Sequence, residues 1–377
     1  MDFDFTDEQQ SLRDAVRRWV DKGFAFERRH RLAQAGGYTR PLYAELAELG
    51  LTGLAIPEAH GGLGFGAVEA MVACEELGRG LVNAPYVHGA LVAPALLAAA
   101  PAPLQAAWLP RMAGAEALVV LAQQERGARY ALLHAGTNAV AHGGGHVLTG
   151  VKSIVPAGDE ADAFIVPARL AEGDAPAGRV GLFLVERGAG GCTLRGYPTQ
   201  DGARAAELHL DKTPAALIAI DDGDLLERAI DIGIAGICAE GVGLMERLVE
   251  LTVEYMNTRR QFGVTLASFQ ALRHRIADVK MQLELGRSMS YYASLVLGEP
   301  APKRRQAVAQ AKVQLGQSMR FVGQQCVQLH GGIGVTDEYI ASHYFKRLTT
   351  LELTFGDTLH HLGEVSRRMH DTAGVFA

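Results

Sequence analysis

The stretch VAQAKVQLGQSMRFVGQQCVQL, residues 308–329, decides the fold class of this 377-residue chain. Its apolar residues recur at steps of three or four, which is the spacing of one face of an α-helix. They are Val308, Ala311, Leu315, Met319, Val322, Cys326 and Leu329. A second stripe runs through Leu272, Ile276, Val279 and Leu283. Two such stripes predict antiparallel helices packed in a C-terminal bundle.

Upstream of the bundle the pattern changes twice. Thr6 and Gln9 have the spacing of a capping box, and helical periodicity follows them. Residues 117–121, 162–166 and 180–185 are short apolar runs typical of strands, and Gly143-Gly-Gly145 predicts a hairpin turn between two such runs. We therefore expect an α+β chain of three domains. They are an N-terminal helical domain (1–114), a middle antiparallel β domain that is a sandwich or barrel (115–222), and a four-helix bundle (223–377).

Composition excludes several classes of protein. The formal charge of -6 and the pI near 6.1 give no basic footprint for nucleic acid. The most apolar stretch, residues 90–100, is too short to span a membrane. The cysteines lie far apart without a CxxC pair, which favours a reducing cytoplasm over a zinc site or a disulfide framework. They are Cys74, Cys192, Cys238 and Cys326.

Three further segments carry a family resemblance. Residues 46–57 read LAELGLTGLAIP and precede Gly61-Gly-Leu-Gly64. Residues 255–263 read YMNTRRQFG and precede Phe269-Gln270, and residues 328–334 read QLHGGIG. In this order and spacing the segments resemble the signatures of the acyl-CoA dehydrogenase family across nearly the whole chain. The glycine-rich stretch after Pro57 follows a helix rather than a strand, so it does not fit a nicotinamide-binding βαβ unit.

The residue types in these motifs suit a nucleotide. Arg259 carries a planar donor fork for a pyrophosphate, and Phe262 offers an apolar face. Gly331 and Gly332 permit close approach of a ligand or a neighbouring chain. Taken alone, the same residues are a solvated arginine and a helix C-cap. The resemblance implies that one set of residues contacts FAD held mainly by an adjacent subunit: Arg259, Gln261, Phe262, Phe269, Gln270, Gln328, Gly331 and Gly332.

The chain departs from the family where its own flavin would be held. The usual Thr-Glu-Pro-Gly-like loop reads QQERGAR at residues 123–129, and the flavin-contacting aromatic-Ile-Thr element reads Ile154-Val-Pro156. Proline has no N–H or hydroxyl to donate. Phe355 occupies the position of the usual glutamate base, and the alternative position on the first bundle helix is Gly233.

Two interpretations remain. In the first interpretation Asp357, two residues beyond Phe355, is a displaced catalytic base, although the same residue also suits the N-cap of a last helix. In the second interpretation the chain is the non-catalytic half of an α2β2 assembly whose partner supplies the base. Residues 196–202 and 343–347 resemble the small subunit of pimeloyl-CoA dehydrogenase and heteromeric steroid-CoA dehydrogenases, which favours the second interpretation.

The resemblance implies a reaction, a cofactor and partners. The family desaturates an acyl-CoA thioester with FAD and passes electrons to an electron-transfer flavoprotein. The expected assembly is a homo- or hetero-tetramer with a larger acyl-CoA dehydrogenase subunit. His330, His343, His360 and His361 lack the spacing of a metal motif, so no metal is expected.

Overall fold

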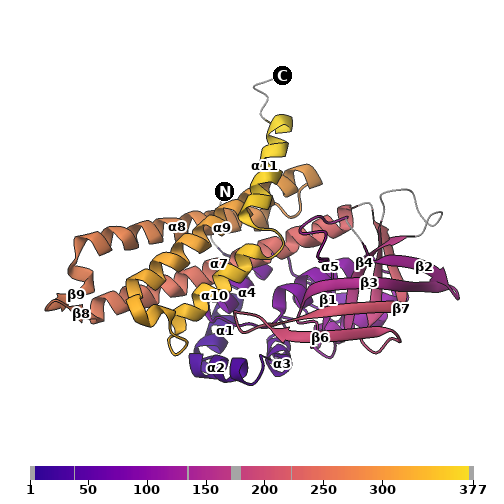
Figure 1. Ribbon diagram of the computed structural model, residues 1–377, viewed down its shortest axis with the longest axis horizontal. Coiled ribbons are helices and arrows are strands. Elements are labelled where there is room, and N and C mark those ends of the chain that lie inside the picture. Colours follow the sequence, from indigo (N-terminus) through magenta and orange to yellow (C-terminus); the bar gives the residue numbers. More distant parts are fainter. Residues whose placement is uncertain (1–4, 38, 134–135, 171–179, 222, 373–377) are drawn as a thin grey trace. The chain divides into compact units, whose positions relative to one another are not determined.

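The computed structural model describes residues 5–37, 39–133, 136–170, 180–221 and 223–372. The chain forms two compact units. We call them the helical unit, residues 1–29, 67–82 and 234–377, and the barrel unit, residues 30–66 and 83–233. Figure 1 labels most of their helices and strands.

The N-terminal third is helical, as its sequence pattern predicts. α1 (Asp7–Gly23) begins after Thr6, whose hydroxyl accepts a hydrogen bond from the Gln9 N–H. The Gln9 side chain accepts the Thr6 N–H in return, which confirms the capping box. The other helices of this part are α2 (Phe26–Gln34), α3 (Arg40–Glu48), η1 (Glu58–His60), α4 (Ala67–Arg79), η2 (Val87–Val92), α5 (Ala93–Leu97) and α6 (Ala102–Ala113).

The barrel unit is built around a sheet that closes on itself. Strands β4, β2, β3, β7 and β5 pair in that order, and β5 pairs back with β4. The strands are β1 (Val119–Leu121), β2 (Asn138–His142), β3 (Gly145–Pro156), β4 (Ala163–Leu170), β5 (Val180–Glu186), β6 (Cys192–Pro198) and β7 (Arg204–Asp221). The prediction of purely antiparallel pairing is wrong in one respect: β1 and β2 run parallel to β4. Apolar runs indicate strands but not their direction.

The predicted hairpin turn between β2 and β3 is confirmed. His142 pairs with Gly145, so Gly143 and Gly144 form a two-residue loop. Their φ angles are 57° and 80°, which is the type I′ geometry that glycine adopts without strain.

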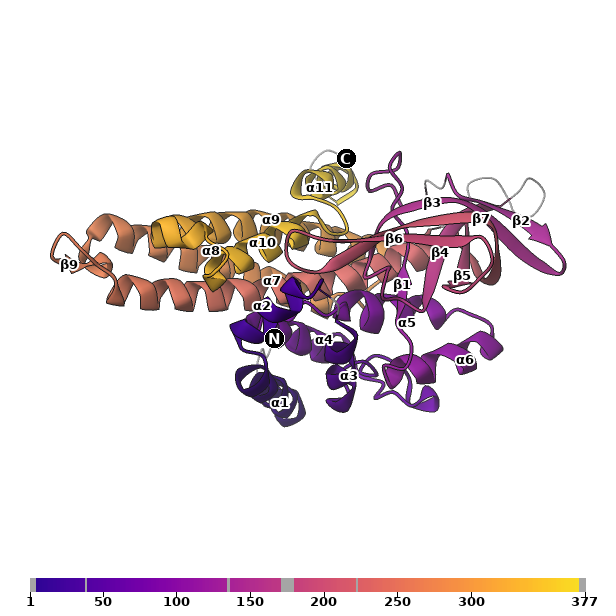
Figure 2. The ribbon, with the colours of Figure 1, turned by 60° about the horizontal axis from the view of Figure 1, so that its bottom comes forward.

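The helical unit contains the bundle. Its main helices are most of α7 (Asp224–Thr258), then α8 (Gln270–Leu295), α9 (Ala301–His330), α10 (Ile340–Leu353) and α11 (Thr358–Thr372). Between them lie β8 (Arg260–Gln261), β9 (Val264–Thr265), η3 (Leu266–Ser268) and η4 (Gly331–Val335). All seven apolar residues of the 308–329 stripe are buried, and α8 packs along α9 (Figure 2). In the described residues no helix is both long and apolar enough to cross a membrane.

Candidate functional site

The Arg259 corner, residues 259–270, connects the end of α7 to the start of α8. α7 ends at Thr258, the β8–β9 hairpin follows, and Phe269 is the N-cap of α8. Arg259, Gln261 and Gln270 are exposed. Among the described residues the Arg259 guanidinium has no hydrogen-bond or ion-pair partner. Its N–H donors are therefore available to an anionic ligand.

Phe262 is held towards solvent by an unfavourable turn. Its side chain is 92% exposed, and it forms the two-residue hairpin loop with Gly263. The φ angles of the two residues are 52° and 83°, a type I′ turn that favours Asn-Gly and disfavours a bulky first residue. The ring meets Phe269 edge to face at a centroid distance of 6.3 Å. Its exposure and its strained backbone together make Phe262 a candidate binding residue.

The glycine corner, residues 331–332, directly follows Gln328 and His330 of the last turn of α9. Gly331 is the C-cap, and its φ of 66° and ψ of -142° require glycine, so the helix end alone explains this residue. Gly332 lies outside the left-handed region. A Cβ placed on Gly332 would have no heavy atom of the described residues within 4 Å. Packing against the described residues therefore does not require glycine at position 332, which leaves room for a ligand beside its backbone.

A cluster of three mutually tilted rings joins the two corners. The Tyr255 ring, one turn before the Arg259 corner, lies 4.7 Å from the His330 ring, which directly precedes the glycine corner. The centroid of the Tyr339 ring lies 5.1 Å from that of the His330 ring. The structure thus brings the two predicted corners together at one end of the helical unit. The sequence motif contains Tyr255 and His330, but their contact is not visible in it.

Asp357 is the N-cap of α11. Its Oδ1 accepts a hydrogen bond of 2.8 Å from the His360 N–H, and its backbone carbonyl accepts the His361 N–H at 3.1 Å. This geometry fits the capping interpretation of Asp357. Phe355, at the position of the usual base, has a φ of 58°, which is rare for a bulky residue. The backbone at Phe355 is therefore left-handed, although the side chain at this position has no carboxylate to present.

A buried polar cluster supports this turn. Lys312 donates hydrogen bonds of 2.8 Å to two backbone carbonyls at the end of α10. Glu352 accepts from the Thr358 hydroxyl at 2.6 Å, and His361 Nε2–H donates to the Phe355 carbonyl at 3.0 Å. Burial lowers the pKa of Lys312 to about 8. Burial and the nearby Lys312 charge lower the pKa of His361 to about 3.

Replacing His361 with glutamine should make the protein less sensitive to acid. The His361 pKa is about 3 in the folded chain, whereas histidine in an unfolded chain has a pKa near ~6.5. Between these values the unfolded state binds more protons, so stability falls as the pH is lowered through this window. Glutamine keeps an N–H donor for the Phe355 carbonyl and does not titrate.

At pH 5 the His361→Gln protein should therefore retain about 2 kcal/mol more of its neutral-pH unfolding free energy than the wild type. Urea unfolding near neutral pH and at the acidic value measures the difference. His274→Gln, on the exposed surface of α8, is the matched control. Equal acid sensitivity of the wild type and the His361 variant would contradict the assignment.

In the barrel unit, the element at residues 154–156, which differs from the family's flavin-contacting element, has an unusual backbone. Ile154 lies in a β-bulge of β3 with a φ of 52° and is 51% exposed. A β-branched residue in this conformation is an outlier. In the loop at residues 123–129, which differs from the family pattern, Glu125 accepts hydrogen bonds from Lys152 Nζ at 2.7 Å and from the Thr137 hydroxyl at 2.8 Å. Sequence reasoning missed this buried pair, whose members lie far apart in the chain.

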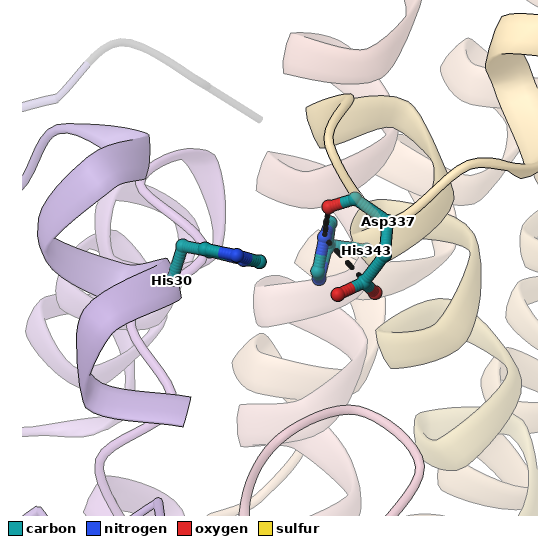
Figure 3. A group of neighbouring side chains, drawn as sticks. All are labelled: His30, Asp337 and His343. Atoms are coloured by element: carbon teal, nitrogen blue, oxygen red, sulfur yellow. Dashed lines mark hydrogen bonds and ion pairs between the residues drawn. The ribbon is translucent and has the colours of Figure 1, made fainter. Parts of the chain in front are cut away.

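His343, one of the four histidines considered for a metal, has both ring nitrogens engaged. Its Nε2–H donates to the Asp337 carbonyl at 2.8 Å, the contact drawn in Figure 3. Its Nδ1 accepts from Arg29 Nη1 at 2.8 Å. Burial lowers the pKa of His343, which keeps the ring neutral in this arrangement. A metal ion would have to displace one of these partners.

The two segments that resemble heteromeric relatives have internal structural roles. In the first segment, a Cβ on Gly196 would lie 2.1 Å from Asp159 Oδ2, so only glycine fits there. In the second segment, the buried Tyr344 hydroxyl donates to the Arg79 carbonyl at 2.6 Å. These residues stabilise the two units separately and do not identify a ligand.

The comparisons with known proteins agree with the motifs. Residues 6–116 match the model of the acyl-CoA dehydrogenase N-terminal domain, and residues 223–370 match that of the C-terminal domain. Acyl-CoA dehydrogenase IpdE2 of Mycobacterium tuberculosis is 30% identical over 90% of this chain and 91% of the relative. Acyl-CoA dehydrogenase FadE27 of the same organism is 28% identical over 99% of this chain and all of the relative.

Solved structures give the same result over the full length. The ChsE4–ChsE5 complex from Mycobacterium tuberculosis contains a chain with 27% identity and a TM-score of 0.88, covering 99% of this chain and 100% of that one. A variant of the steroid acyl-CoA dehydrogenase Tcur3481–Tcur3483 also has 27% identity and a TM-score of 0.88, covering 98% and 99%. The resemblance and the expected order of helical, β and bundle parts are confirmed. The chain belongs to the acyl-CoA dehydrogenase family.

Proposed function

We propose that this chain is the FAD-completing subunit of a hetero-oligomeric acyl-CoA dehydrogenase. A second chain of the same family supplies the flavin-ring contacts and the catalytic base. The assembly, a tetramer in the cytoplasm, desaturates an acyl-CoA thioester and passes electrons to an electron-transfer flavoprotein. The observation that carries the proposal is the 92% exposure of Phe262 on a strained turn. A ring presented in this way suits a ligand housed in another polypeptide.

The cofactor is FAD, and this chain has residues that suit it. When bound, FAD takes up the hydride from the β-carbon of the thioester. The free Arg259 guanidinium is placed to pair with the pyrophosphate, and Phe262 to cover an apolar face of the nucleotide. The open backbone at Gly332 allows close approach. The exposed amides of Gln261 and Gln328 add neutral donors.

The residues missing from this chain's own flavin site support the proposal that a second chain supplies the flavin-ring contacts and the base. Pro156 offers no N–H or hydroxyl, and Phe355 cannot accept a proton. The residues that would serve a neighbour are present, whereas those that would serve the chain's own flavin are missing. The names of the steroid-type relatives favour a steroid-derived acyl chain, and the sequence resemblance adds a dicarboxylic thioester as the alternative.

Expression tests this assignment directly. The chain is purified alone and after co-expression with the acyl-CoA dehydrogenase chain encoded nearest to it. We expect colourless protein from the first preparation and a yellow complex from the second, with acyl-CoA-dependent reduction of an artificial acceptor only in the second. A yellow, active protein from the chain alone would overturn the non-catalytic role.

The second candidate function is an active site of the chain's own with Asp357 as the base. It is favoured by one observation: the carboxylate lies on the same turn as Phe355, two residues beyond the usual base position. Capping and catalysis use the carboxylate differently, so substitutions separate them.

We expect Asp357→Asn to leave the activity and stability of the assembly unchanged, because asparagine caps a helix as well as aspartate does. Asp357→Ala should lower the unfolding free energy by about 1 kcal/mol through loss of the cap. Thermal melting and acyl-CoA turnover of both variants measure these effects. Loss of turnover in the Asn variant at an unchanged melting temperature would establish Asp357 as the base.

A further inference from the structure

His330 is a buried polar ring at the exposed end of the helical unit. It is 3% exposed although the next residues, Gly331 and Gly332, are exposed. Its Nδ1–H donates to the Cys326 carbonyl at 2.8 Å, and its Nε2 accepts from the Tyr339 hydroxyl at 3.2 Å. Burial lowers the pKa of His330, so these bonds are made by the neutral ring. Its tautomer and orientation are thereby fixed.

Tyr255 connects this ring to the Arg259 corner. The Tyr255 and His330 ring centroids lie 4.7 Å apart at an interplanar angle of 32°. Tyr255 lies in the last turn of α7, and Arg259 directly follows Thr258, the last residue of that helix. The helical hydrogen-bond pattern continues to the first residue of the corner, because the Arg259 N–H donates to the Tyr255 carbonyl at 2.8 Å. The ring contact therefore fixes where the Arg259 corner begins.

Tyr339 closes the segment that follows the glycine corner. Tyr339 lies nine residues after His330, and its hydroxyl is hydrogen-bonded to His330 Nε2. Within this segment a Cβ on Gly334 would lie 2.6 Å from the Val327 carbonyl, so the chain packs tightly against the end of α9. The glycine corner is thus held on one side by α9 and on the other by the Tyr339–His330 hydrogen bond.

We propose that Tyr255, His330 and Tyr339 form a latch that holds the Arg259 corner and the glycine corner at the spacing a dinucleotide requires. His330 is a positioning residue in this latch and does not itself contact the ligand. The inference rests on the proposed function, since it concerns the same nucleotide site. Fixing both corners before binding removes an ordering penalty that flexible corners would impose on affinity.

The experiment measures FAD binding to the apo-assembly of this chain with its FAD-holding partner, by quenching of flavin fluorescence. His330→Ala should weaken FAD binding at least about tenfold, because both corners lose their support. Tyr339→Phe, which removes one hydrogen bond, should weaken it about fivefold. His274→Ala, on the exposed surface of α8, is the control and should have no effect.

A double-mutant cycle with Arg259→Ala separates positioning from a general structural role. If the latch acts in part through the Arg259 corner, His330→Ala and Arg259→Ala together weaken FAD binding by less than the sum of their separate losses. Additive losses, or normal binding by the His330 and Tyr339 variants, would overturn the latch. If His330→Ala fails to fold, the cycle with Tyr339→Phe decides. Normal FAD binding by Arg259→Ala would instead refute the proposed function itself.

Discussion

Replacing Phe262 with asparagine is expected to stabilise the β8–β9 hairpin and to abolish retention of FAD. Asn-Gly is the preferred pair for a type I′ turn, whereas phenylalanine at φ 52° is strained. Relief of this strain should raise the stability of the hairpin by about 1 kcal/mol. Loss of the exposed ring should weaken FAD binding about 100-fold, as for an aromatic residue that anchors an interface.

The opposite signs of the two effects make this substitution decisive. Replacing a residue that serves folding lowers the stability of the protein. Replacing a residue that serves binding but strains a turn raises that stability. Thermal melting of the chain and FAD titration of the assembly give the two values. Val264→Thr changes the neighbouring exposed apolar residue in β9 and serves as control. Unchanged FAD binding in the Phe262 variant would remove the main support for the proposed function.

Much of the helical architecture was predictable because burial imposes a period on the sequence. All seven apolar residues of the 308–329 stripe are buried in α9. The capping box was equally predictable, since Thr6 and Gln9 lie three residues apart in the sequence. The parallel pairing of β1 and β2 with β4 was not predictable. Side-chain alternation along a strand contains no information about the direction of its neighbour.

The candidate site was predictable in chemistry but not in conformation. The guanidinium of Arg259 and the missing donors of Pro156 are properties of single residues. The left-handed backbone of Phe262 opposes the intrinsic preference of phenylalanine, so no local signal could reveal it. The contact between Tyr255 and His330 joins residues that are separated in the sequence by α8 and nearly all of α9. Such contacts require the packing of α7 against the end of α9.

Gly243→Ala is expected to destabilise the helical unit by about 3 kcal/mol, because a new methyl group would collide with backbone atoms rather than with a flexible side chain. A Cβ on Gly243 of α7 would lie 1.9 Å from the Glu75 carbonyl of α4. A Cβ on Gly78 of α4 would lie 2.2 Å from the Glu240 carbonyl of α7. The two helices thus approach through a glycine on each side, and added volume on either one must push them apart.

The same chemical change should have the opposite effect in α11. A Cβ on Gly363 meets no heavy atom of the described residues within 4 Å, so Gly363→Ala should stabilise its helix by about 1 kcal/mol. Comparing the two variants by urea unfolding separates steric collision from helix propensity, which is identical in both. Gly243→Ala should also weaken FAD binding, because α7 leads directly into the Arg259 corner. A Gly243 variant as stable as the wild type would show that α4 and α7 do not approach this closely.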